Sequence, residues 1–206
     1  MKGGWLVGMV AVVVLAYITV NSLRTEALEP LARGTRLPSF AVPLAESAND
    51  RDANVFPGPG RGPDDEPPAC TVRGPEVLNV CELAERGPVV LAWVVTGLGE
   101  CARQVDVLDR VAARVPGVSF AAIAVRDDRQ QVRRLIRDRG WSIPVGYDHD
   151  GAAANAYGLG AVCPLLTFAG RDGRVERSEL GFTDEAELEA AARALAAGRP
   201  LTAEPR

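Results

Sequence analysis

An α/β fold, with helices on both faces of a central sheet, is predicted by three features of the sequence. Two apolar runs rich in β-branched residues, 88–95 and 118–126, have the composition of strands buried on both faces. Each is followed by a segment with apolar residues at helical spacing, 99–115 and 127–140. An Asp-Gly turn signal at 172–173 then joins two extended segments, and a helical pattern closes the region. This order of strands and helices is typical of an α/β sandwich.

The helix ends are marked by capping residues. Asp127 or Asp128 suits the first helix cap after the second strand, and Gly140 suits its end. The last helix, within "TDEAELEAAARALAAG", begins at Thr183 or Asp184 and ends at Gly198.

Shorter elements fill the rest of the region. The segment 37–45 is extended, since its two prolines disfavour a helix. "CTVRGPEVLNVCEL", residues 70–83, is predicted to form two short strands around an Arg-Gly-Pro-Glu turn. Residues 143–148 form a short extended segment and 151–159 a short helix. Between 37–45 and 70–83, residues 46–69 are rich in Pro, Gly and Asp and are interpreted as a flexible insertion.

The N-terminus has the length and composition of a membrane anchor. Gly3 to Leu23 supplies the roughly 20 apolar residues that a spanning helix needs. A cleaved signal peptide is the alternative, but "TVNSLRTEA" offers a poor cleavage site, so we favour an uncleaved anchor at 1–23. Lys2 keeps the N-terminus inside, although Arg24 weakens that bias. The sequence therefore predicts a single-pass protein of the cell membrane with its domain on the extracytoplasmic side.

The domain organisation follows from these boundaries. A juxtamembrane linker at 24–36 leads to one α/β domain at 37–198, and 199–206 form a tail. Because domains most often have about 100–150 residues, a chain of 206 suggests one domain with attachments, and hydrophobic residues make up 47% of it, enough for a core.

Composition also excludes several classes of function. The net charge is −4, and arginines alternate with acidic residues, as in "RDDRQQVRRLIRDRG", so no nucleic-acid-binding face is expected. No phosphate loop, dinucleotide fingerprint or Ser-His-Asp signal occurs. The single histidine, His149, has no second histidine near it and is interpreted as a solvated turn residue. We expect neither a metal nor a cofactor.

Four cysteines, at 70, 81, 101 and 163, carry the remaining chemistry. Outside the cytoplasm disulfides form and persist, and an even count suits pairing. Four cysteines allow three pairings, among which the sequence does not choose. Cys101 lies near a predicted helix N-terminus, where the partial positive charge favours a thiolate. Cys101 also heads an apolar stripe, however, and burial would leave it an inert core residue.

The chain resembles the thioredoxin-like redoxins over about residues 34–195. The resemblance depends on "GTRLPSF", on "PVVLAWVVTGLGEC" and on "YDHDGAAANAYGLGAVCPLLTFAGRDGRV". The nearest branch is similar to the membrane-anchored TlpA/ResA-type thioredoxins, with peroxiredoxins as more distant cousins. The resemblance implies a thioredoxin-like fold with a central mixed sheet. It also implies thiol–disulfide exchange with protein partners, or a peroxide substrate.

The chain departs from the family at the active site. Cys101 matches the second cysteine of the family's C-x-x-C motif, and Leu98 stands where the attacking cysteine belongs, giving "LGEC". The peroxiredoxin pattern is not met either, since Val94 and Leu98 stand where its Pro and Thr would be. Thr96 and Arg103 are the candidate supports of Cys101.

Pro164 aligns with the proline that is cis in thioredoxin folds. The resemblance places the residue before it, Cys163, beside the start of the active-site helix. We therefore hypothesise that the missing cysteine has been replaced by Cys163, in a Cys101–Cys163 couple. The pair requires Cα atoms less than about 7 Å apart.

Cys70 and Cys81 are expected to form a structural disulfide across their two short strands. Three functions remain open at this point. The first is a membrane-tethered thiol–disulfide oxidoreductase, and the second is a thiol peroxidase that uses Cys101. The third is a non-catalytic interaction module with structural sulfurs only.

Overall fold

The computed structural model describes residues 29–49, 69–159 and 163–201. The predicted anchor at 1–23, most of the insertion at 46–69 and most of the tail at 199–206 lie outside these residues and stay predictions. Within the described part of the chain, no helix is both long and apolar enough to cross a bilayer.

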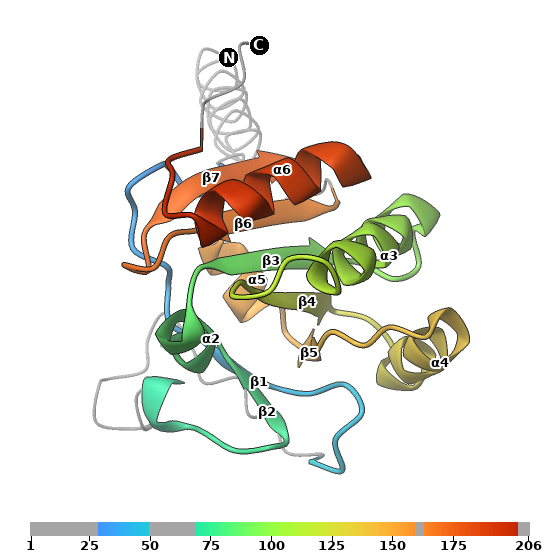
Figure 1. The fold of residues 1–206 in the computed structure, drawn as a ribbon. Coiled ribbons are helices and arrows are strands. Elements are labelled where there is room, and N and C mark those ends of the chain that lie inside the picture. The colour runs from blue at the N-terminus through green and yellow to red at the C-terminus, as the bar shows by residue number, and fades with distance from the viewer. Residues whose placement is uncertain (1–28, 50–68, 160–162, 202–206) are drawn as a thin grey trace, which may run out of the picture.

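A five-stranded mixed sheet forms the centre of the domain (Figure 1). Its strands are β3 (Val89–Val94), β4 (Ser119–Val125), β5 (Val145–Asp148), β6 (Leu165–Ala169) and β7 (Val175–Leu180), in the spatial order β5-β4-β3-β6-β7. β3, β4 and β5 are mutually parallel, whereas β6 runs antiparallel to β3, and β7 to β6. The sheet agrees with the predicted order of buried strands followed by a hairpin.

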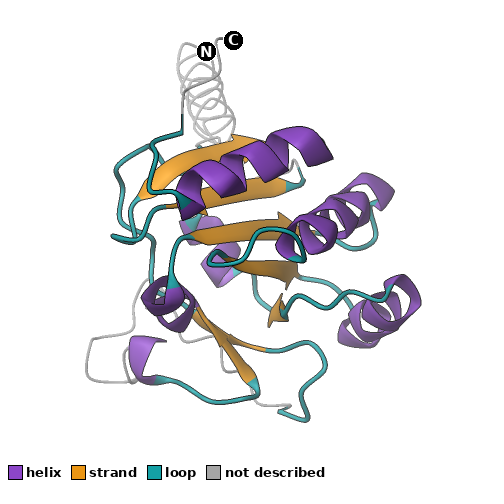
Figure 2. Ribbon diagram, in the orientation of Figure 1, coloured by secondary structure: helices purple, strands orange, loops and turns teal. Residues whose placement is uncertain are grey.

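Helices cover both faces of this sheet, as predicted (Figure 2). One face packs against α3 (Gly99–Ala112), α4 (Arg129–Arg139) and α6 (Glu185–Ala196). The other face packs against α2 (Val80–Arg86), α5 (Ala152–Ala156) and a small sheet of β1 (Ala41–Pro43) with β2 (Val77–Asn79). β3 serves both cores, since alternate side chains of a strand point to opposite faces.

An aromatic cluster lies beside β3, in the core on the face of the sheet that α2 and α5 cover. Trp93, which points from β3, lies 5.3 Å from the ring of Phe40 and 4.5 Å from that of Tyr157, centroid to centroid. The Tyr157 hydroxyl donates to the carbonyl oxygen of Pro38 at 2.8 Å, which satisfies its buried polar end. The cluster attaches the segment that enters the domain to the sheet and to α5.

Capping residues explain where α4 begins and ends and where α6 begins. The Asp128 side chain accepts the N–H of Gln131 and caps α4, and Gly140 ends that helix with a left-handed φ of 70°. Asp184 caps α6 by accepting the N–H of Glu187. Of the alternatives left open by the sequence, Asp128 and Asp184 are therefore the capping residues.

The prediction of two strands within 70–83 is wrong in part. The structure has a 3-10 helix, η1 (Ala69–Thr71), then β2, then α2 from Val80. Asn79 is the reason: its side-chain oxygen accepts the N–H of Cys81 and starts a helix, while its side-chain nitrogen donates to the carbonyl oxygens of Ala69 and Val72. The β2 strand therefore pairs with β1 rather than within a local hairpin.

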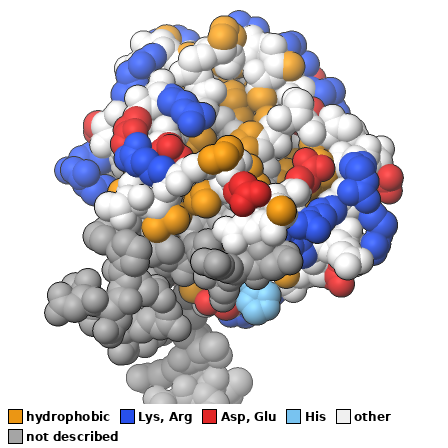
Figure 3. Space-filling model, turned by 90° about the horizontal axis from the view of Figure 1, so that it is seen from below, with side chains coloured by type: hydrophobic (Ala, Val, Ile, Leu, Met, Phe, Trp, Pro, Cys, Tyr) orange, Lys and Arg blue, Asp and Glu red, His pale blue; other side chains and the backbone are white. Residues whose placement is uncertain are grey.

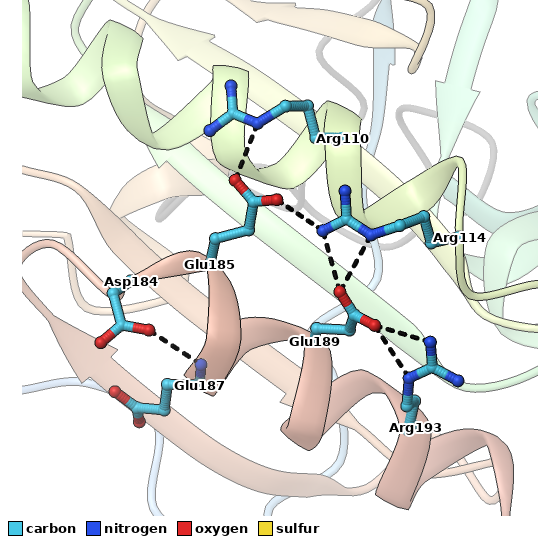
Figure 4. A network of polar contacts seen from close by, with 7 residues as sticks. All are labelled: Arg110, Arg114, Asp184, Glu185, Glu187, Glu189 and Arg193. Atoms are coloured by element: carbon cyan, nitrogen blue, oxygen red, sulfur yellow. Dashed lines mark hydrogen bonds and ion pairs between the residues drawn. The ribbon is translucent and has the colours of Figure 1, made fainter.

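An ion-pair network joins α3 and α6 along their exposed sides (Figure 4). Glu185 accepts from Arg110 at 2.8 Å and from Arg114 at 2.6 Å, and Glu189 pairs with Arg114 and Arg193. The Arg110 and Arg114 guanidiniums hold the pKa of Glu185 below its usual value. Because these groups are exposed, we assign the network to positioning α6 along α3 rather than to a large part of the stability.

A buried carboxyl group at the end of β5 makes stability depend on pH. Asp148 is fully buried and accepts the N–H of Ala154 at 2.8 Å, yet burial raises its pKa to about 6. A raised pKa means that the folded state favours the protonated carboxyl group. The contribution of Asp148 to the free energy of unfolding is therefore full below about pH 4 and is lost as pH rises through about 6.

We expect Asp148→Asn to raise the free energy of unfolding at pH 7 by about 1–3 kcal/mol, and to have no such effect at pH 4. The asparagine oxygen still accepts the Ala154 N–H and carries no buried charge. Urea unfolding at both pH values measures the difference, with Asp138→Asn, an exposed carboxyl group on α4, as the control. Equal effects at the two pH values would refute the assignment.

Candidate functional site

The site lies at the sheet edge where β3 ends and α3 begins. β6 runs antiparallel to β3, and Leu165 at its start is in register with Trp93 near the end of β3. The residues just before β6 therefore lie beside those just after β3. This topology alone brings Cys163 to the first turn of α3, although 62 positions separate it from Cys101.

Cys101 and Cys163 are joined by a disulfide with a Cα–Cα distance of 5.8 Å. This distance lies within the usual range for a disulfide, about 4.4–6.8 Å. Cys101 is the third residue of α3 and only 1% exposed, as part of the core between α3 and the sheet. Cys163 is partly exposed and packs against the edge of the same core. The disulfide thus connects a buried helix N-terminus to a surface loop.

The loop that carries Cys163 is fixed on both sides. The Val95 N–H donates to the Cys163 sulfur, with a nitrogen–sulfur distance of 3.2 Å. The Cys163–Pro164 peptide bond is cis, as the resemblance implied, and the Pro164 carbonyl accepts the Gly181 N–H at 2.8 Å. Backbone groups just after β3 and just after β7 therefore hold Cys163 and Pro164 beside the start of α3.

Leu98 occupies the position of the missing cysteine. It is the N-cap residue of α3, and its side chain is 52% exposed. Its carbonyl oxygen accepts the N–H groups of Cys101 and Ala102, at 3.0 and 3.3 Å. Leu98 thus begins the helix with its backbone while it presents an apolar side chain to solvent beside the disulfide.

The two predicted supports of Cys101 have different surroundings. Thr96 is buried at the end of β3, and its N–H donates to Asp127 at 2.7 Å. Arg103 is exposed, and its guanidinium carbon lies 4.8 Å from the centre of the Phe182 ring. The structure therefore places Thr96 in the loop before Cys101, and Arg103 over an aromatic ring rather than on the disulfide.

Sequence reasoning missed Asp127 as a residue of this edge and took it only as an alternative helix cap. It follows β4, which is parallel to β3, so both strands end at the same edge. Burial raises the pKa of the Asp127 carboxyl, although the Thr96 and Gly97 N–H groups oppose that rise. A search for polar residues after neighbouring parallel strands would have found it.

Gln104 and the segment after β7 close the other side of the site. The buried Gln104 side chain accepts the Thr183 N–H at 2.8 Å and donates to the Thr183 carbonyl at 3.2 Å. This pair of hydrogen bonds places the preceding residue, Phe182, beside the first turns of α3. Among the described residues, the exposed large hydrophobic side chains are Leu98, Leu180 and Phe182. All three come from segments that converge on this edge.

Cys70 and Cys81 form the second disulfide, with a Cα–Cα distance of 5.4 Å. Cys81 lies on α2, which ends just before β3 begins, so this disulfide is at the opposite end of the strand. β3 is about 16 Å long at the usual rise per residue. The two disulfides are therefore separate features of the domain.

On the face shown in Figure 3, basic and acidic side chains are interspersed around apolar ones, and no basic stripe is formed. Within the described ranges, no group of three or more His, Cys, Asp or Glu side chains is placed to hold a metal ion.

Comparisons with known proteins bear on the fold. No protein-family model and no curated protein matches the sequence. Among solved structures, a secreted Mycobacterium tuberculosis disulfide oxidoreductase homologous to Escherichia coli DsbE is similar, with 23% identity and a TM-score of 0.53. That match covers 58% of this chain and 90% of the other.

Two further solved structures are similar to this chain. A putative thiol:disulfide interchange protein DsbE from Chlorobium tepidum has 16% identity and a TM-score of 0.58, over 79% of this chain and 99% of the other. A secreted thiol-disulfide isomerase from Corynebacterium glutamicum has 22% identity and a TM-score of 0.54, over 61% and 79%. The chain has a thioredoxin-like fold, and the resemblance drawn from the sequence is confirmed for the fold.

Proposed function

We propose that this chain is a membrane-tethered, extracytoplasmic thiol–disulfide oxidoreductase whose redox couple is Cys101–Cys163. One observation carries the proposal: a disulfide joins the first turn of α3 to the cis-proline loop, with one of its two cysteines partly exposed. A thiolate reacts with a disulfide only if it reaches a sulfur. The couple thus lies where the resemblance implies the family's chemistry.

The reaction exchanges one disulfide for another. A partner thiolate attacks the disulfide, forms a mixed disulfide with one sulfur and releases the other as a thiolate. The second thiol of the partner then attacks the mixed disulfide and releases the protein as a dithiol. The partner dithiol loses two electrons and two protons, and the Cys101–Cys163 disulfide gains them.

The surface around the couple fits a polypeptide partner. The exposed apolar side chains of Leu98, Leu180 and Phe182 lie on segments that meet at the disulfide, and apolar patches of this kind mark interaction sites. The structural neighbours are described as a disulfide oxidoreductase, an interchange protein and an isomerase. We therefore propose protein thiols or disulfides as the substrates.

The location outside the cytoplasm is proposed from the sequence. Gly3 to Leu23 has the length and composition of a spanning helix, and two disulfides among four cysteines suit an oxidising compartment.

Burial of Cys101 separates this proposal from peroxidase activity on that residue. A peroxidatic cysteine must meet peroxide as an accessible thiolate, and Cys101 is only 1% exposed. We therefore favour exchange over peroxide reduction.

The proposal is tested by equilibrating the full-length protein, in detergent, across a series of glutathione redox buffers. We expect the Cys101–Cys163 disulfide to open at a potential above about −300 mV, where structural disulfides stay closed. Cys70–Cys81 serves as the internal control and is expected to stay closed.

A further inference from the structure

The two cysteines of the Cys101–Cys163 couple differ in exposure, and that difference bears on their roles. Cys101 is 1% exposed within the core under α3, whereas Cys163 is partly exposed in its loop. Resting on the proposed function, we infer that Cys163 is the attacking and attacked cysteine and that Cys101 is the resolving cysteine. The order of roles along the chain is then the reverse of a C-x-x-C site, where the attacking cysteine comes first.

The geometry of exchange supports this assignment. The incoming thiolate, the attacked sulfur and the leaving sulfur lie close to one line in disulfide exchange. An approach to the Cys163 sulfur therefore comes from the loop side, opposite Cys101. An approach to the Cys101 sulfur would have to come from the core side, through packed side chains of the cluster that holds Cys101. Packing in that core therefore opposes attack at Cys101 and favours attack at Cys163.

Hydrogen-bond donors favour the same roles. In the reduced protein, the Val95 N–H that lies 3.2 Å from the Cys163 sulfur would stabilise a thiolate there. Cys101, as the third residue of α3, lies in the first helical turn, whose partial positive charge favours it as a leaving thiolate. The partly exposed Cys163 is therefore suited to attack. The buried Cys101 is suited to act as the leaving group and then to resolve the mixed disulfide.

Leu98 explains why the usual arrangement does not operate. In the family pattern an exposed cysteine at this position attacks, but here an apolar side chain, 52% exposed, takes that place. The reacting position has moved across the edge from the start of α3 to the loop before β6. The partner's thiol is then expected to enter on the Cys163 side of Leu98.

The assignment is tested with full-length Cys101→Ser and Cys163→Ser variants and the disulfide reagent DTNB. We expect Cys101→Ser to release one nitrothiobenzoate per chain at least about tenfold faster than Cys163→Ser, since only Cys163 is accessible in the folded protein. Unfolding in guanidinium should bring the two rates together. A Cys163→Ser variant that reacts as fast as Cys101→Ser, or faster, would overturn the assignment.

A second measurement needs no variant. The wild-type protein is reduced just enough to open the couple, treated with limiting iodoacetamide and mapped by mass spectrometry. Alkylation concentrated on Cys163 supports the assignment, and equal or greater alkylation of Cys101 contradicts it. The proposed function is tested by a different result. If the wild-type disulfide resists reduction at mild potential while the two variants still differ in rate, the proposed function is wrong although the difference in access holds.

Discussion

Replacing either Cys163 or Cys101 by serine is expected to abolish oxidation of a dithiol substrate by the oxidised protein. Each variant should lose at least about 100-fold in rate, since residues that act as one unit lose most of their activity on removal of either member. A variant with one cysteine left at the couple has no Cys101–Cys163 disulfide, so nothing there accepts the two electrons and two protons of the substrate dithiol. The rate of disulfide formation in a synthetic peptide dithiol, followed by mass spectrometry, measures this loss.

The matched control is the Cys70→Ser/Cys81→Ser pair, which should retain the wild-type rate within about twofold, because distant sites act independently. Peroxide consumption by the reduced wild type is followed in parallel and should stay at the rate of buffer. Retained oxidation in Cys163→Ser would refute the couple. Peroxide consumption that depends on Cys101 would favour the peroxidase alternative.

Removing the Cys70–Cys81 disulfide is expected to lower the free energy of unfolding by about 2–4 kcal/mol, because it closes a short loop of the unfolded chain. The cysteines join η1 to α2, where Asn79 binds both segments through three hydrogen bonds. Breaking the covalent link leaves those bonds to hold the segment alone. Urea unfolding of Cys70→Ser and of Cys81→Ser, compared with the wild type, measures the cost.

The double variant distinguishes the disulfide from the individual side chains. If the bridge causes the loss, the pair loses about as much as either single variant, because one bond is broken in all three. Losses that add, or a loss below about 0.5 kcal/mol, would show that the bridge contributes little to stability.

Much of the fold was predictable, because buried strands and amphipathic helices leave strong periodic patterns. The runs at 88–95 and 118–126 became β3 and β4, and the cis proline was placed through the resemblance. The segment 70–83 was misjudged because one residue decides it. Asn79 caps a helix only in the presence of carbonyl groups from η1, and local propensity does not show those.

The site was predictable to the extent that topology determines it. Cys163 reaches α3 through the antiparallel register of β6 with β3, which a hairpin pattern and a family resemblance together suggest. The contact of Gln104 with Thr183 was not predictable, since it spans 79 positions and leaves no local pattern. The different exposure of Cys101 and Cys163 also needed the structure, because it depends on packing across α3.

The most direct test of the redox couple is disulfide mapping of the full-length protein across the glutathione series. The account predicts that peptides linked through Cys101 and Cys163 disappear at mild potential, while those linked through Cys70 and Cys81 persist. A Cys101–Cys163 link that survives to potentials below about −300 mV would mean that this disulfide is structural. The thioredoxin-like fold would then serve a role other than thiol exchange.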